Sequence, residues 1–393
     1  MTRQEHIASV NALIAELGGG IFAGVLKSFD FGAFQGYYVN APKIALVQLV
    51  DTGLIKSIEQ DKKIFISSPV LPRPHDKVLR ARNAPTDTTV TTVLDATWGQ
   101  ARISHRIPDQ TDYTYETISH PAAATVYVID TGIQTTHWEF NSTSKPGTSR
   151  ARWGHNWIAS SPDTDENGHG THVSGTIAGL TYGVAPRAAL VACKVFDADG
   201  GGTWSDMIDA LGWACHDAAA RGAVNASVVN LSAGGGFYQP INDAVSAAVG
   251  LGLAVVVAAG NDGGRVGDIS PASCPDAVAV SATDEQDRRP DWASWGPGVA
   301  FFAPGVDVTS AWIGGGGQES AVLDGTSMSC PHVAGLAAYW MGMFGGHTPA
   351  QLRARLGRLA TNGTVVDAGA GSANAIVYNG NKVYFDEVTD SVG

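Results

Sequence analysis

The sequence predicts an α/β protein built around a doubly wound, mostly parallel sheet with helices on both faces, preceded by a small α+β module. From residue 125 onward, short apolar runs alternate with longer segments of helical periodicity, which is the pattern of β–α–β units. The strands are expected at 126–129, 190–195, 227–231, 253–258 and 278–280, and the helices at 205–220, 240–250 and 327–344. In such a sheet, functional groups gather at the carboxyl ends of the strands.

Residues 1–90 show a different pattern, which predicts a small module and a linker. Residues 6–68 suggest a helix at 7–17, a further apolar segment at 21–31 and a strand at 43–50. Residues 69–92 are rich in Pro, Arg, Asn and Thr and predict a linker. We therefore expect one domain at 1–90, which includes this linker, and a second at 91–393.

Composition limits the partners. The chain is 44% hydrophobic and 16% charged, which predicts a folded globular protein with an ample core. Its net charge is −12; residues 1–90 hold 10 Lys+Arg and 8 Asp+Glu, so this part carries +2 and the remainder −14. Binding to nucleic-acid phosphates needs clustered Lys and Arg, so we expect no nucleic-acid partner. No apolar stretch reaches about 18 residues, so we expect no membrane span, and the N-terminus lacks the apolar core of a signal peptide.

Three distant motifs carry residues suited to nucleophilic catalysis. Asp130 ends an apolar run and can hold the tautomer of a histidine. His169 lies between two glycines, and an imidazole can take up a hydroxyl proton near neutral pH. Ser327 follows Gly-Thr and precedes an apolar helical segment, so its hydroxyl would lie at a helix N-terminus, which favours developing negative charge. A fourth motif, Ala-Ala-Gly before Asn261, supplies an amide that can stabilise an oxyanion.

These motifs, in the order Asp130, His169, Asn261, Ser327, resemble those of the subtilisin-like serine peptidases, and within them the proteinase K group. The similarity runs from about residue 98 to 380. It implies a Ser-His-Asp acyl-enzyme mechanism acting on proteins or peptides, with broad specificity, a preference for apolar residues and no cofactor for catalysis. We expect a monomer.

The segment 6–61 resembles the inhibitory propeptide of the same enzymes, which implies an autoprocessed zymogen whose propeptide is an intramolecular inhibitor, cut between about 77 and 93. Such a module opens with a strand, and only five residues precede His6. Either the module is truncated or the natural start lies upstream of Met1, and we favour the second. Family resemblance also implies secretion.

Two glycine-rich strings resemble the edge segments that pair with an extended substrate, since glycine lets a peptide backbone come close. The expected substrate-binding residues are Gly200, Gly201, Gly202, Trp204, Ser232, Ala233 and Gly234.

Other readings predict different structures. His172 with His169 could form half of a zinc site, but no third ligand is evident, and by resemblance His172 is a packing residue. Asp-Thr-Gly occurs at Asp51 and at Asp130, which would suit an aspartic peptidase with two similar β-rich lobes. A non-catalytic, peptide-binding homologue is the remaining alternative, although no member of the triad is substituted.

Metal and cysteine content stay open at this stage. Proteinase K relatives hold a structural calcium ion with an Asp where this chain has Ala300, and loss of that carboxylate makes the ion doubtful here. Asp276 lies close in sequence to the expected carbonyl ligands and is a weak substitute. The four cysteines allow three complete pairings, and several could equally be buried thiols.

Overall fold

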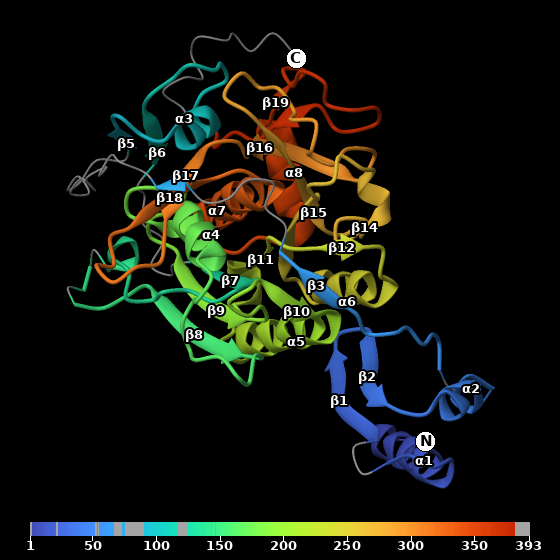
Figure 1. Cartoon of the computed structure of the whole chain (residues 1–393). Helices are drawn as coiled ribbons and strands as arrows, with labels where there is room; N and C mark the ends of the chain where they lie inside the picture. Colours follow the sequence, from blue (N-terminus) through green and yellow to red (C-terminus); the bar gives the residue numbers. More distant parts are fainter. Residues whose placement is uncertain are drawn as a thin grey trace. The chain divides into compact units, whose positions relative to one another are not determined.

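The computed structural model describes residues 2–20, 23–51, 53, 55–66, 73–74, 90–116, 124–142, 144–145 and 147–381. The chain divides into two compact units, 1–62 and 63–393. The division falls before the boundary expected at residue 90, because residues 63–65 pair with a strand of the larger unit. The helices and strands of both units are labelled in Figure 1.

The smaller unit has two helices and a hairpin. Helix α1 (Arg3–Glu16) begins with a capping box between Thr2 and Glu5. Strands β1 (Gly24–Phe31) and β2 (Phe34–Asn40) are antiparallel. Helix α2 (Lys43–Asp51) occupies the segment expected as a strand, so that expectation is wrong. A short apolar run fits either period, and the (i, i+4) pair Ala45 and Leu49 buries against α1, which decides for a helix.

The larger unit is organised by a nine-stranded sheet in the order β19-β20-β16-β15-β13-β11-β7-β9-β8, parallel throughout except where β19 meets β20. This confirms the predicted fold class. The strands are β7 (Thr125–Asp130), β8 (Ala151–Asn156), β9 (Ala189–Lys194), β11 (Ser227–Leu231), β13 (Ala254–Ala258), β15 (Val278–Thr283), β16 (Val299–Pro304), β19 (Thr361–Asn362) and β20 (Ala375–Ile376).

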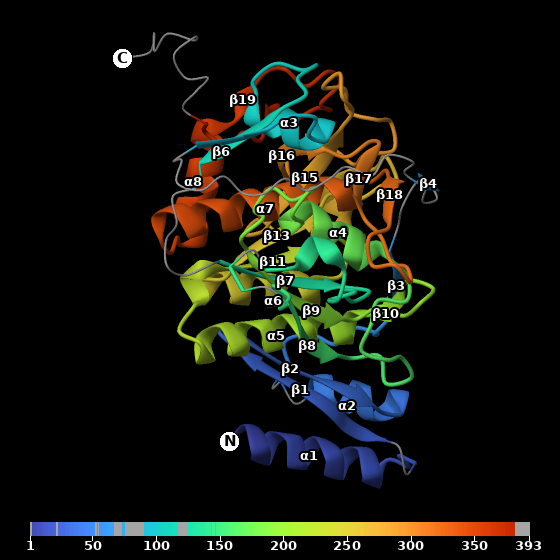
Figure 2. The same ribbon diagram turned by 90° about the vertical axis from the view of Figure 1, so that its left-hand side faces the viewer.

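Helices cover both faces of this sheet. Helices α4 (His169–Ala178) and α7 (Thr326–Phe344) pack on one another, as do α5 (Trp204–Ala220) and α6 (Gln239–Gly250). Figure 2 shows the first pair on one side of the strands and the second pair on the other. The central strands β7, β11 and β13 are buried at every residue, because both of their faces are covered. Two further helices are α3 (Trp98–Ser104) and α8 (Pro349–Leu359).

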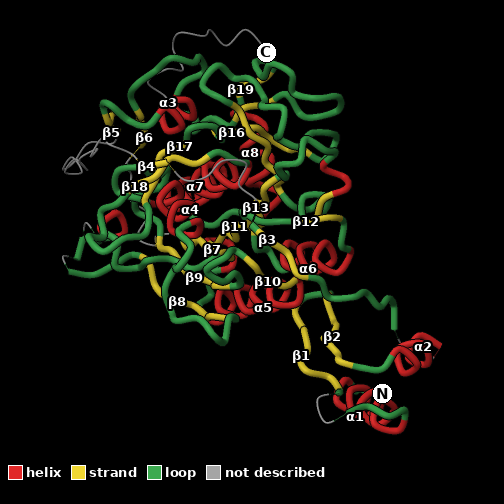
Figure 3. The backbone as a smooth tube through the Cα atoms, viewed as in Figure 1, coloured by secondary structure: helices red, strands yellow, loops and turns green. Residues whose placement is uncertain are grey.

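Short strands complete the unit, and Figure 3 separates them from the loops by colour. Strand β3 (Lys63–Phe65) pairs with β10 (Gly201–Thr203), β5 (Val90–Val93) with β6 (Tyr113–Glu116), and β12 (Gly235–Gly236) with β14 (Ile269–Ser270). Strands β17 (Val308–Ala311), β18 (Ser320–Leu323) and β4 (Arg73–Pro74) form a three-stranded sheet. The 3₁₀ turns are η1 (Trp138–Phe140), η2 (Val224–Ala226) and η3 (Val266–Asp268). Within the described ranges, no helix has the length and apolar character needed to cross a membrane.

Candidate active site

The sheet and helix α4 bring Asp130 and His169 into contact. Asp130 is the last residue of β7 and His169 is the first residue of α4, and both side chains are buried. The Nδ1 atom of His169 lies 2.8 Å from Oδ1 of Asp130, so the ring donates this proton to the carboxylate. Burial lowers the pKa of His169, but the charge of Asp130 and the hydrogen bond to it outweigh this effect, and the net shift is upward.

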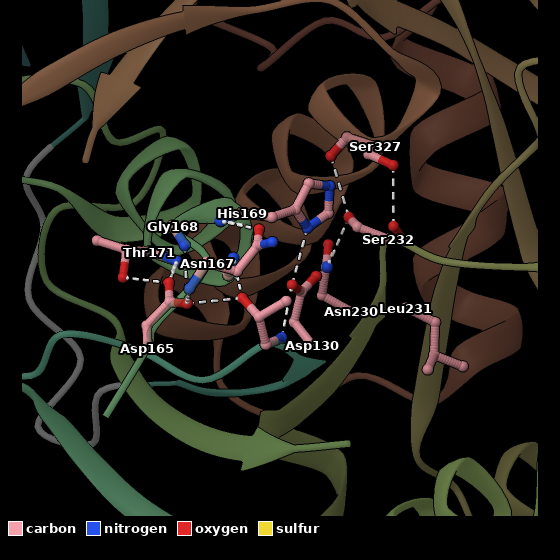
Figure 4. A network of polar contacts seen from close by, with 12 residues as sticks. Asp130, Asp165, Asn167, Gly168, His169, Thr171, Asn230, Leu231, Ser232 and Ser327 are labelled. Atoms are coloured by element: carbon pink, nitrogen blue, oxygen red, sulfur yellow. Dashed lines mark hydrogen bonds and ion pairs between the residues drawn. The ribbon is translucent and has the colours of Figure 1, made fainter. Parts of the chain in front are cut away.

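Ser327 lies in the first turn of α7 and is 3% exposed. Its Oγ donates to the carbonyl oxygen of Ser232 at 2.9 Å, while the hydroxyl of Ser232 donates to the carbonyl oxygen of Ser327 at 3.0 Å. His169 Nε2 is buried and has no hydrogen-bond partner among the described residues. Figure 4 shows the imidazole between the carboxylate of Asp130 and the side chain of Ser327. The structure therefore contains the Asp-His bond but not a Ser-His bond.

Asn261 follows strand β13 after a tight turn at Gly260, whose φ is 108°. Its Oδ1 accepts hydrogen bonds from the backbone N–H and the hydroxyl of Thr326, both at 2.8 Å. These two bonds fix the orientation of the amide beside the residue that precedes Ser327. Asn261 and Ser327 line the same pocket of about 150 Å³.

The glycine-rich segment 233–235 borders this pocket, whereas the string 200–204 runs through β10 into the start of α5. Ala233 and Gly234 are part of its wall. Gly201 and Gly202 belong to β10, and Trp204 begins α5, where its ring stacks on Tyr238 with centroids 5.2 Å apart. A Cβ atom at Gly202 would lie 2.3 Å from the Val195 carbonyl oxygen, so this position of β10 accommodates only glycine without a shift of the backbone.

Strand β3, from the segment before the linker, lies along β10. Phe65, Ile64 and Lys63 pair with Gly201, Gly202 and Thr203, and the N–H of Ile66 donates to the carbonyl oxygen of Gly200 at 3.0 Å. The sequence does not reveal this pairing, because a run of three or four apolar residues carries no partner information.

His172 has a structural environment. Its Nε2 donates to the carbonyl oxygens of Val308 and Ala321, at 3.0 and 3.2 Å, and burial lowers its pKa to about 3. Nε2 is thereby occupied by two carbonyls, while Nδ1 is buried without a hydrogen-bond partner in the described part of the chain. Among the described residues no cluster of three His, Cys, Asp or Glu side chains surrounds this ring to complete a zinc site. The parallel sheet likewise contradicts the two β-rich lobes that an aspartic peptidase requires.

The residues at the expected calcium position do not fit the ion. Ala300 in β16 offers no carboxylate, and Asp276 accepts a hydrogen bond from the Ser246 hydroxyl at 2.7 Å. The carbonyl oxygens of Pro275 and Ala277, which flank Asp276, both accept from Nη1 of Arg353, at 2.9 and 3.2 Å. A guanidinium thus already donates to the two carbonyl oxygens nearest Asp276, which makes this position a poor fit for calcium.

The four cysteines, Cys193, Cys215, Cys274 and Cys330, are all buried and unpaired in the structure. This favours the reading of buried thiols over a disulfide framework.

Comparison with known proteins agrees with this geometry. A model of the subtilase family of peptidases matches residues 122–377. Subtilisin-like protease 2 of Pseudogymnoascus destructans is 40% identical over 358 residues, covering 91% of this chain and 81% of its own. A cuticle-degrading serine protease of Arthrobotrys oligospora is 38% identical over 381 residues, covering 95% of this chain and 85% of its own. A crystal structure of a cold-adapted subtilisin-like serine proteinase superposes with a TM-score of 0.65 at 35% identity, covering 73% of this chain and all of that one.

Proposed function

This chain belongs to the subtilase family of serine endopeptidases, and from that premise we propose that it cleaves peptide bonds through an acyl-enzyme formed on Ser327. His169 would serve as the general base and Asp130 as the group that orients it. The observation that carries the assignment is the 2.8 Å bond between Asp130 and His169, in the same buried site as Ser327.

The chemistry requires one movement. Ser327 Oγ must leave the carbonyl of Ser232 and turn to Nε2 of His169, the ring nitrogen that has no partner among the described side chains. Nε2 then accepts the hydroxyl proton as Oγ attacks, and later returns it to the leaving amine. The amide of Asn261 and the backbone N–H of Ser327 would stabilise the oxyanion, which is supported by the pocket that both residues line.

Covalent labelling tests this assignment. A fluorophosphonate should label the wild-type enzyme, and Ser327→Ala should abolish both labelling and casein hydrolysis. Ser329→Ala is the matched control, because this hydroxyl lies two residues along the same helix and donates to the Ala303 carbonyl instead. Labelling that persists in Ser327→Ala would contradict the assignment, and a folded wild-type protein that is never labelled would favour a non-catalytic, peptide-binding role.

We also propose that the chain is an autoprocessed zymogen, with residues 1–66 as its inhibitor. Strand β3 supports this, since Lys63–Phe65 lies antiparallel to β10 as an extended peptide would. Ile64 is 5% exposed, and both Ile64 and Trp204 come within 3.5 Å of the space above Gly235. This apolar niche supports a broad specificity with a preference for apolar side chains.

The register moves the expected cut site. Ile66 is the last residue before a gap in the described ranges whose backbone bonds to the β10 segment. We therefore propose a scissile bond soon after it, before the stretch 77–93 predicted from the sequence. Those residues lie outside the described ranges. N-terminal sequencing of the mature product and intact mass should give a start soon after residue 66, and Ser327→Ala should stay a single 40.8 kDa chain. A start beyond residue 77 would refute this register.

Inhibition can be tested separately. The isolated segment 1–66 should slow peptide cleavage when added to mature enzyme, and the variant Ile64→Asp should do so less well, because it places a charge in the apolar niche. No slowing by either segment would remove the inhibitory role. By family resemblance we further propose a secreted monomer.

A further inference from the structure

Asp165 is a buried carboxylate with a dense set of hydrogen bonds. It lies in the loop before α4 and is 4% exposed. Its Oδ1 accepts from the hydroxyl of Thr131 at 2.8 Å and from the backbone N–H groups of Asn167 and Gly168 at 3.1 and 2.9 Å. Its Oδ2 accepts from the N–H and the hydroxyl of Thr171, at 2.9 and 2.7 Å. Figure 4 shows these contacts beside His169.

These bonds join the two elements that carry the Asp-His pair. Thr131 follows Asp130, and its backbone N–H donates to Oδ1 of Asp130 at 2.7 Å. The same Thr131 hydroxyl that donates to Asp165 accepts from the N–H of Gly170 at 2.9 Å. Gly170 follows His169. The carboxylate of Asp165 therefore ties the end of β7 to the N-terminal turn of α4, which carries His169.

The charged groups nearest His169 among the described residues are mostly buried. Asp130 contacts the ring, and Asp165 lies in the adjacent loop; both favour the protonated ring and contribute to its raised pKa. Lys194 is the buried cation of this region: its Nζ donates to the Thr131 carbonyl at 2.7 Å and lies 3.8 Å from Glu166. His172 stays neutral in the working range because its pKa is about 3.

We propose that Asp165 is a positioning residue for the peptidase reaction. Its carboxylate holds His169 in register with Asp130, and its negative charge supports the imidazolium that forms when Ser327 loses its proton. The inference rests on the proposed function. It assigns to Asp165 a role distinct from that of Asp130, since none of the Asp165 hydrogen bonds drawn in Figure 4 goes to the His169 ring.

Asp165→Asn is the decisive variant, because it keeps the size of the side chain while removing the charge and placing an N–H₂ among hydrogen-bond donors. We expect kcat on a peptide substrate to fall about 10-fold to 100-fold with little change in KM, as misplacement of a reacting group produces. The acid limb of the pH profile of kcat/KM should move to lower pH, because a charge that favours the imidazolium is lost. A purely structural role would leave that limb in place.

Glu166→Gln is the matched control. It removes the same charge one residue further on, from a side chain that is 32% exposed and whose partners are the Ser161 hydroxyl and Lys194. We expect wild-type kcat and an unchanged acid limb. Asp165→Asn with wild-type kcat, or with lowered kcat and an unmoved acid limb, would overturn the proposal, as would equal effects of the two variants.

A second variant covers the case in which Asp165→Asn does not fold. Thr171→Val removes one hydroxyl donor to Asp165, together with the acceptor of the Gln134 backbone N–H, and leaves the backbone bond to Asp165 and the charge in place. We expect kcat to fall several-fold with KM unchanged; an unchanged kcat would refute the positioning role. Failure of the proposed function is distinguishable, because it would appear as peptide cleavage that survives Ser327→Ala, whatever Asp165 does.

Discussion

Gly170 offers a sharp test of how tightly the site is built. A Cβ atom at this position would lie 2.1 Å from the carbonyl oxygen of Gly132 and 3.1 Å from Oδ1 of Asp130. Nonbonded carbon and oxygen atoms approach to roughly 3.5 Å without repulsion. Gly170→Ala therefore forces the first turn of α4 away from the end of β7 by about 1 Å.

The displacement acts directly on catalysis, because Gly170 is adjacent to His169. A shift of about 1 Å would stretch the 2.8 Å bond between Nδ1 of His169 and Asp130 beyond hydrogen-bond reach. Misplacement of this size can cost about 10²-fold in rate, which is about 2.7 kcal/mol of transition-state stabilisation. Overpacking should also lower the free energy of unfolding by about 1 to 3 kcal/mol.

The assay is kcat/KM on a chromogenic peptide, normalised by active-site titration, with thermal unfolding measured in parallel. Gly342→Ala is the matched control: it lies inside helix α7, and a Cβ there meets nothing within 4 Å. This control should keep full activity and gain about 0.5 to 1 kcal/mol of stability. Wild-type kcat/KM in Gly170→Ala would refute the claim that this contact sets the His-Asp geometry.

Three further outcomes are expected. The raised pKa of His169 places the acid limb of kcat/KM above pH 6.5, since only the neutral ring accepts a proton. The same raised pKa contributes folding stability that is full below pH 6.5 and is lost as pH rises through the folded-state pKa. An acid limb below pH 6.5 would contradict both expectations. In the inactive Ser327→Ala background, Arg102→Met should lower the free energy of unfolding in urea by about 3 to 5 kcal/mol. The reason is that the buried Asp287 carboxylate loses its partner, to which it is bonded at 2.6 and 2.8 Å. Adding Asp287→Asn to Arg102→Met should recover part of the loss. Chelation by EDTA should leave the unfolding temperature unchanged, whereas a calcium-dependent rise would show that Arg353 does not replace the ion.

Much of the larger unit follows from local patterns. The helices expected at 205–220, 240–250 and 327–344 correspond to Trp204–Ala220, Gln239–Gly250 and Thr326–Phe344. Buried parallel strands appear as continuous apolar runs because both faces are covered, and amphipathic helices between them keep a 3.6-residue period. The segment 43–50 fails because a short apolar run fits both periods, and only its contact with α1 selects the helix.

The site is only partly visible in the sequence. Asp130, His169 and Ser327 stand out because each occurs in a short motif whose local geometry suits its chemistry. Asp165 and Arg353 do not, because what distinguishes them is the set of N–H, hydroxyl and carbonyl groups that distant segments bring to them. The side-chain rotation of Ser327 toward the Ser232 carbonyl is likewise a tertiary contact that no local pattern encodes.

The arrangement also explains why activity should appear only late in folding. Asp130 is delivered by a central strand and His169 by a helix that packs on the face of the sheet, while Ser327 opens the helix beside it. Lys194, on the neighbouring strand β9, donates to the Thr131 carbonyl and adds positive charge beside these carboxylates. A partly folded chain lacks this balance, so it would leave carboxylates uncompensated or hydrated and the imidazole unoriented. In a protease assembled in this way, the catalytic site forms together with the compact fold that protects the chain from proteolysis.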